Sequence, residues 1–170
     1  PDSSVKIEIV DQGVANFHGL IVTAASSCLQ MRFSRLGLRS AESVAFATFA
    51  AEPANLAIAS GFEPRGARPG DVMLGQPWVV VRDVFGNTCT GPAVDGSEII
   101  ANLIHQATPK WQGLIAGQPE LRGNPSLRIT AGGAQFTDLR IDMAGNYQLS
   151  FQALSLKVIS NEVVVVTGLG

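Results

Sequence analysis

The residue types that most often perform chemistry are sparse and scattered in this chain. Catalysis by an activated nucleophile requires a base and an orienting group that converge on one reacting atom. The 170 residues include two histidines, His18 and His105, and each falls in a run whose pattern predicts a strand. The sequence has no Gly-x-Ser-x-Gly elbow and no glycine-rich loop that ends in Gly-Lys-Ser/Thr. We therefore expect no catalytic residue, no cofactor and no enzymatic activity.

Four carboxylates are candidates for a calcium site if the fold brings them together: Glu52, Asp71, Asp83 and Asp95. Clustered carboxylate oxygens are the ligands that Ca²⁺ prefers. The chain contains no Asp-x-Asp cluster, however, and isolated acids of this kind commonly cap turns. We expect turn caps here and assign no metal ligand.

The two cysteines, Cys28 and Cys89, leave two interpretations open. They form one disulfide, or each is a small buried apolar side chain. No Cys-x-x-Cys spacing occurs, which argues against a zinc site.

Trp111 and Arg65 are the candidate ligand contacts. An exposed tryptophan can stack on a sugar or peptide, and Arg65 lies in a loop over residues 61–75 that is rich in glycine and proline. Packing in a core or at a sheet edge is the competing interpretation for Trp111, as it is for Trp78. These residues carry the alternative hypothesis of a carbohydrate- or peptide-binding module.

Composition excludes several classes of protein. With 46% hydrophobic and 15% charged residues, the chain is not intrinsically disordered. A net charge of −2 argues against a nucleic-acid partner, and no apolar run is long enough to insert into a membrane as a helix. The 18 glycines and 9 prolines, among short runs rich in valine and isoleucine, are typical of an all-β domain with many turns.

An internal repeat organises the chain. Residues 13–23 (GVANFHGLIVT) resemble residues 132–142 (GGAQFTDLRID), which places Phe17 on Phe136. The two stretches lie 119 positions apart in the sequence. A repeat period of about this length corresponds to one β-sandwich module. We predict that residues 1–50 are the second half of one module and that residues 51–170 form a complete one.

The rest of the repeat continues after a one-residue slip. Residues 29–33 align with 147–151, and residues 43–46 align with 161–164. The alanine-rich stretch 41–51 has a helix-like pattern, but the repeat predicts a strand there, and we follow the repeat.

Short apolar or alternating runs between turn residues predict the strands of the complete module. They cover residues 56–58, 78–84, 98–104, 126–130, 134–141, 147–151 and 162–167. Strands of this number and spacing favour two packed sheets.

Three stretches of this module resemble the immunoglobulin-like modules strung in tandem in large surface proteins of filamin or invasin type. They are residues 75–87 (GQPWVVVRDVFGN), 133–149 and 160–166 (SNEVVVV). The resemblance implies an immunoglobulin-like β-sandwich. It also implies that Tyr147 forms a tyrosine corner, and the Asp-x-x-Gly-Asn motif predicts that Asp83 caps a turn.

The same resemblance implies a function. Such modules are structural or adhesive units of large extracellular, cell-surface or ciliary-surface proteins, where they act as spacers and protein interaction surfaces. The implied partners are neighbouring modules of the same or another chain and other surface or matrix proteins. Asn87-Thr88-Cys89, a rare variant of the glycosylation sequon, is the feature that fits a glycoprotein.

A half module raises the question of what completes it. Strands without a partner sheet expose ladder groups and an apolar face. The partner is upstream chain, a neighbouring chain or the complete module itself. We expect the sequence to be a slice of a longer tandem array, whose short linker over residues 48–53 favours a stiff rod.

Overall fold

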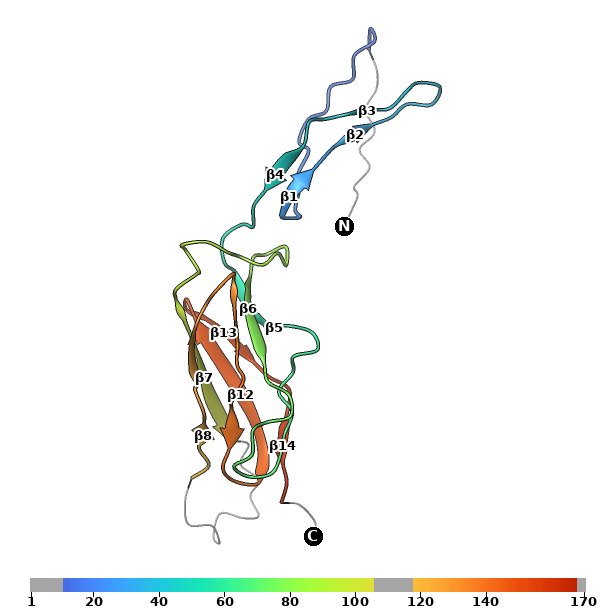
Figure 1. The fold of residues 1–170 in the computed structure, drawn as a ribbon. Helices are drawn as coiled ribbons and strands as arrows, with labels where there is room; N and C mark the ends of the chain where they lie inside the picture. Colours follow the sequence, from blue (N-terminus) through green and yellow to red (C-terminus); the bar gives the residue numbers. More distant parts are fainter. Residues whose placement is uncertain (1–10, 106–117, 168–170) are drawn as a thin grey trace. The chain divides into compact units, whose positions relative to one another are not determined.

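The computed structural model describes residues 11–105 and 118–167 (Figure 1). The chain divides into two compact units, residues 1–50 and 51–170. The described residues form strands, turns and loops without any helix, so none of them forms a membrane-spanning helix. The prediction of an all-β chain is confirmed.

Residues 11–50, the described part of the first unit, form two short antiparallel strand pairs. Its strands are β1 (Ser26–Leu29), β2 (Arg32–Phe33), β3 (Ala41–Glu42) and β4 (Phe46–Thr48). β1 pairs with β4, and β2 pairs with β3. Since β3 and β4 occupy the alanine-rich stretch, the choice of strand over helix there is confirmed.

The described residues of the second unit form ten strands. They are β5 (Asn55–Ile58), β6 (Trp78–Arg82), β7 (Glu98–His105), β8 (Leu121–Arg122), β9 (Ser126–Arg128), β10 (Gly133–Gln135), β11 (Arg140–Ile141), β12 (Gly145–Ala153), β13 (Leu156–Ile159) and β14 (Val163–Val165). One sheet has the order β10-β6-β5, and a larger one has the order β13-β12-β7-β9, with β14 also on β12. β8 and β11 form a separate pair. No sheet of the described residues closes into a barrel.

The core of this unit lies between the two larger sheets. On β12, the alternate residues Tyr147, Leu149 and Phe151 are fully buried, and Val79 and Val81 of β6 are buried from the other sheet. β5 contacts both β12 and β13 across the interior. Burying each large apolar side chain stabilises the fold by roughly 1.5–3 kcal/mol. The arrangement is compatible with a β-sandwich.

The expected strand over residues 134–141 is instead two strands in different sheets. Between the two strands, Nε2 of the Gln76 side-chain amide donates to the Leu139 carbonyl at 2.9 Å. Its Oε1 accepts the Leu139 N–H at 3.1 Å. The Met73 N–H also donates to the Leu139 carbonyl, at 3.0 Å. Leu139 thus lies where the chain passes from β6, which it leaves after Gln135, to β8, with which it pairs from Arg140.

The sequence pattern also did not predict β13 as a separate strand. β12 and β13 are joined by a two-residue turn at Leu154 and Ser155, whose φ angles are 50° and 63°. Turns of this kind normally carry glycine or asparagine. Leucine and serine therefore gave no hairpin signal.

The repeat is visible in a set of hydrogen bonds centred on a serine. In the second unit, Ser160 Oγ accepts the Leu149 N–H at 2.9 Å and donates to the Asn161 carbonyl at 2.7 Å. The Ser160 N–H donates to the Leu149 carbonyl at 2.8 Å, and Gln148 Nε2 donates to the Ser160 carbonyl at 3.1 Å.

The first unit makes the same four bonds. Ser43 Oγ accepts the Met31 N–H at 2.9 Å and donates to the Val44 carbonyl at 2.8 Å. The Ser43 N–H donates to Met31, and Gln30 Nε2 donates to the Ser43 carbonyl at 3.4 Å. Ser43 is thus equivalent to Ser160, which shifts the predicted alignment of this stretch by one residue.

A pair of phenylalanines repeats in the same way. Phe136 and Phe151 lie 5.4 Å apart between ring centroids, with an interplanar angle of 48°. Phe17 and Phe33 lie 5.3 Å apart at 50°. These are the residues that the sequence repeat aligns, so the equivalence of the two stretches extends to their packing.

One part of the repeat prediction is wrong for the first unit. Residues 15–25 form no strand, whereas their equivalents in the second unit include β10 and β11. β10 pairs with β6 and β11 pairs with β8, both from the first part of the module. Among the described residues of the first unit, no strand equivalent to β6 or β8 exists for residues 15–22 to pair with.

Replacing Ser160 with alanine should destabilise the second unit by about 1–3 kcal/mol, because the buried Leu149 N–H loses its acceptor. Urea unfolding should show a lower midpoint with an unchanged slope. Thr137→Ala, on the exposed surface, is the matched control and should change stability by less than about 0.5 kcal/mol. Equal midpoints for the two variants would contradict the role given to Ser160.

Candidate functional site

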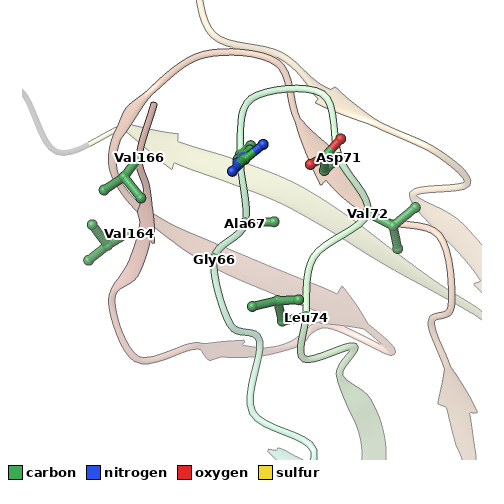
Figure 2. Close-up of a pocket in the computed structure, with 8 residues that line it drawn as sticks. Gly66, Ala67, Asp71, Val72, Leu74, Val164 and Val166 are labelled. Atoms are coloured by element: carbon green, nitrogen blue, oxygen red, sulfur yellow. The ribbon is translucent and has the colours of Figure 1, made fainter. Parts of the chain in front are cut away.

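The loop that carries Arg65 lies along β14. Figure 2 shows residues 66–74 as a loop that runs out and back beside the segment that bears Val164 and Val166. The Val166 N–H donates to the Ala67 carbonyl at 3.3 Å. A Cβ at Gly66 would collide with the Val164 carbonyl oxygen, so glycine is required at this crossing. The loop therefore covers an edge of β14.

The loop over residues 66–74 and the segment around β14 line an open hollow of about 390 Å³ (Figure 2). It is lined by Gly66, Ala67, Arg68, Asp71, Val72, Leu74, Val164 and Val166. Its lining is mostly aliphatic, with one cation and one carboxylate and no aromatic ring. Such a surface suits an apolar peptide side chain better than a sugar, which aromatic rings usually hold.

The predicted ligand contacts do not meet in this hollow. Arg65 is exposed, and its N–H donates to the Gly75 carbonyl at 3.3 Å, but its side chain does not line the hollow. Trp111 lies outside the described residues. Trp78 is partly exposed at 39% and packs edge-on against Phe62, with ring centroids 5.4 Å apart. Trp78 thus packs against another aromatic ring from β6, the central strand of its sheet.

Asp83 is the most strongly bonded acid of the described residues. Its fully buried carboxylate accepts the N–H groups of Phe85, Asn87 and Ala51, each at 2.9 Å. It also accepts Asn87 Nδ2 at 2.8 Å. The predicted turn cap is confirmed, and through Ala51 the same carboxylate holds the first residue of the second unit.

The environment of Asp83 sets its charge. Burial alone would favour the neutral acid, but the bonds from the Asn87 side chain and from the backbone of Ala51, Asn87 and Phe85 lower its pKa to about 2. Asp83 is therefore ionised across the physiological range.

Asp95 has a similar role at a second turn. Its carboxylate accepts the Gly132 N–H at 2.9 Å and the Gly91 N–H at 2.8 Å, and these bonds lower its pKa. Gly132 has a φ of +80°, and an added Cβ would press on Thr88 and on the Cys89 carbonyl. Within the described ranges, no group of three or more His, Cys, Asp or Glu side chains could hold a metal ion.

Both cysteines are free thiols in this structure. Cys28 is exposed. Cys89 is buried, and burial, together with the negative charge of Asp83, raises the pKa of its thiol. Its Sγ lies 3.5 Å from the Ala51 carbonyl, so Ala51 is held from two sides.

Two further polar arrangements hold strand ends in place. Tyr147 is buried, and its hydroxyl donates back to the Met143 carbonyl at 3.1 Å, which is the predicted corner.

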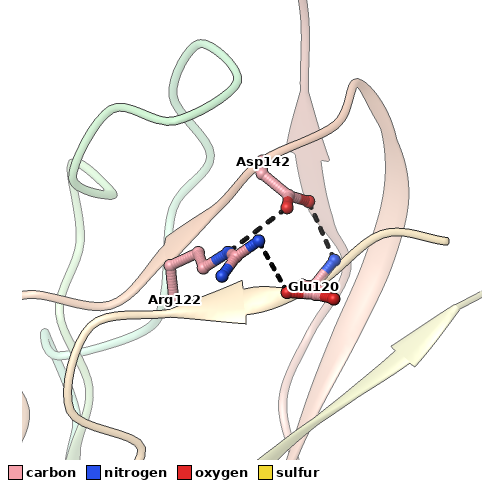
Figure 3. A network of polar contacts seen from close by, with 3 residues as sticks. All are labelled: Glu120, Arg122 and Asp142. Carbon is pink, nitrogen blue, oxygen red and sulfur yellow. Dashed lines mark hydrogen bonds and ion pairs between the residues drawn. The ribbon is translucent and has the colours of Figure 1, made fainter. Parts of the chain in front are cut away.

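Figure 3 shows Arg122 between two carboxylates, with Nη2 2.7 Å from Glu120 and Nε 3.4 Å from Asp142. The Glu120 N–H also donates to Asp142 at 2.8 Å, so the group extends the pairing of β8 and β11.

Sequence reasoning missed this ion group, because no spacing relates Glu120 and Arg122 to Asp142. All three are at least partly exposed, and exposed ion pairs contribute only about 0–1 kcal/mol. Arg122 engages each of the two carboxylates and so links the ends of β8 and β11. His18, the described histidine side chain, is exposed in the first unit.

No protein-family model and no curated protein matches the chain. Solved structures that match include a β-glycosidase from Bacteroides vulgatus, with 16% sequence identity and a TM-score of 0.45. The match covers 80% of this chain and 17% of that one. A likeness at this level carries no argument about activity.

Asp83→Asn should lower the stability of the second unit at pH 7, because an amide cannot accept all four donors. The folded pKa of Asp83 lies below the usual value of about 3.9, so its contribution is complete above about pH 5 and disappears as the pH falls from 4 through 2. Urea midpoints of wild type and variant should therefore converge over that range. Asp71→Asn, at an exposed position, is the control; a gap that stays constant down to pH 2 contradicts the assignment.

Alkylation should separate the two cysteines. In the native protein iodoacetamide should modify Cys28 and spare Cys89, because the thiolate is the nucleophile and burial disfavours it at Cys89. Mass spectrometry of tryptic peptides should find modified Cys89 only after unfolding in guanidinium. If both cysteines resist until a reductant is added, they are paired.

Proposed function

We propose that this chain is a non-enzymatic segment of a tandem array of immunoglobulin-like β-sandwich modules. In this view it serves as a spacer and protein interaction surface in a large extracellular or cell-surface protein. The observation that carries the proposal is the recurrence of one contact set, the Ser43 and Ser160 bonds and the two phenylalanine pairs, in both units. Recurrence of both backbone bonding and side-chain packing supports repetition of a module.

The second support is the way the chain enters the complete module. Ala51 donates to Asp83, its carbonyl faces Cys89, and the Ala54 N–H donates to the Arg82 carbonyl at 2.8 Å. These bonds leave little freedom to the chain after residue 50. Short, anchored connections favour a stiff array, which suits a spacer.

The bonding of Tyr147 is the third support. A hydroxyl that bonds back to the backbone at a strand start occurs in immunoglobulin-like domains. The larger sheet, with β12 between β7 and β13, fits the same class. The partners in this proposal are neighbouring modules and other surface or matrix proteins.

The alternative proposal is a ligand-binding module. The hollow between residues 66–74 and β14 favours it, and its aliphatic lining favours a peptide over a carbohydrate. Specific retention on a glycan array that disappears in Arg65→Ala and Trp111→Ala would instead support the carbohydrate version.

The proposed location and size can be measured together. An antibody against residues 51–170 should stain intact, unpermeabilised cells of the source organism. On an immunoblot of the same cells it should recognise a polypeptide much larger than 17.8 kDa. Staining that requires permeabilisation, or a band at the mass of this chain alone, would contradict the proposal.

A further inference from the structure

We propose that the first unit presents a docking surface for a β-sheet built like the first part of the complete module. The surface, called the open face below, comprises Leu20, Val22, Leu29, Met31, Phe33 and Phe46. Its occupant is a polypeptide segment patterned like residues 51–131 of this chain, as a preceding module would supply. The inference rests on the proposed module array and adds the partner and the register.

The open face is the equivalent of a buried core face. Leu139 and Ile141 of the second unit are 0% and 1% exposed, whereas their equivalents Leu20 and Val22 are both 43% exposed. Phe33 is likewise only half-buried, although it makes the same ring contact as the fully buried Phe151. The described residues of the first unit, 11–50, thus make the contacts of a core and include no layer that would cover it.

The second unit shows what seals such a face. β10 and β11, the strands equivalent to the irregular residues 15–23, pair with β6 and β8. The edge of β12 that faces away from β13 pairs with β7 along six residues, from Tyr147 to Gln152. All three covering strands, β6, β7 and β8, lie between residues 51 and 131.

The backbone of the first unit has a matching edge. Because backbone groups alternate between the two sides of a strand, and Met31 directs its N–H and carbonyl toward Ser43, its neighbours Gln30 and Arg32 direct theirs to the other side. Among the described residues, no strand pairs with that side. In the second unit, the equivalents Gln148 and Ser150 lie opposite Ile104 and Asn102 of β7.

This equivalence fixes the register of the occupant. Its residue equivalent to Asn102 should lie opposite Arg32. Its residue equivalent to Gln76 should bond the backbone of Leu20, as Gln76 bonds Leu139 in the second unit.

A second copy of the chain fits the open face less well. Its own residues 51–131 already cover β10, β11 and β12, so donating them would uncover one core to cover another. Two open faces stacked on each other would hide apolar side chains but would supply no strand for the edge at Arg32 or for residues 15–23. We therefore commit to a segment of the preceding-module type.

The test is a fusion in which a second copy of residues 51–131 is placed directly before Gly13, so that residues 13–170 follow it. The intact 170-residue chain is the reference. Amide hydrogen exchange, followed by NMR, should slow by at least about tenfold at Leu20 and Arg32 in the fusion, since local opening would then require the new sheet to open.

Two matched variants carry changes in the added copy alone. Val79→Asp with Val81→Asp, at positions that are fully buried in the second unit, should abolish the slowing at both Leu20 and Arg32. Gln76→Ala should abolish the slowing of amide exchange at Leu20 and preserve the slowing at Arg32. The unchanged second unit reports in each sample that the protein is folded.

Equal exchange at Leu20 and Arg32 in the reference, the fusion and the Asp variant overturns the inference. So does a reference chain that sedimentation shows to be a dimer with both amides already protected, because the occupant is then a second copy. The antibody experiment on the proposed function measures the size and location of the protein, whereas the exchange experiment measures the protection of Leu20 and Arg32. Either proposal can therefore fail while the other holds.

Discussion

A sheet with one apolar face must be covered by a second layer, and this requirement governs both units. In the second unit the layer is present, and Phe136, Leu149 and Phe151 lose all contact with solvent. In the first unit the same contacts form at Phe17, Met31 and Phe33, but the side chains stay half-buried. The difference lies in the covering strands rather than in the residues, since the aligned positions are apolar in both.

Side chains repeatedly take the place of strand partners in this fold. Gln76 bonds both backbone groups of Leu139, Ser160 accepts the N–H of Leu149, and Asp83 gathers the backbone of a turn. Buried backbone groups must find partners, and each of these sites lies where a regular ladder is interrupted. Such side-chain bonds let short strands form a closed hydrogen-bond network without helices or metal centres among the described residues.

Asp83 also links the turn to the unit boundary. Its carboxylate holds Ala51, and Cys89 lies on the other side of the same residue, so the entry of the chain into the second unit is defined by buried groups. The charge of Asp83 persists because four donors outweigh the cost of burial.

Sequence alone determined the all-β class, the equivalence of Phe17 and Phe136, and the cap at Asp83. These follow from the periodicity of apolar residues, from a repeated sequence pattern and from local turn chemistry. Each of the three can be recognised in the sequence without knowing which distant segments are in contact. Tertiary structure decided the break between β10 and β11, the group of Glu120, Arg122 and Asp142, and the free state of both cysteines. Each of these depends on which distant segments meet, and a single sequence does not encode that in any local spacing.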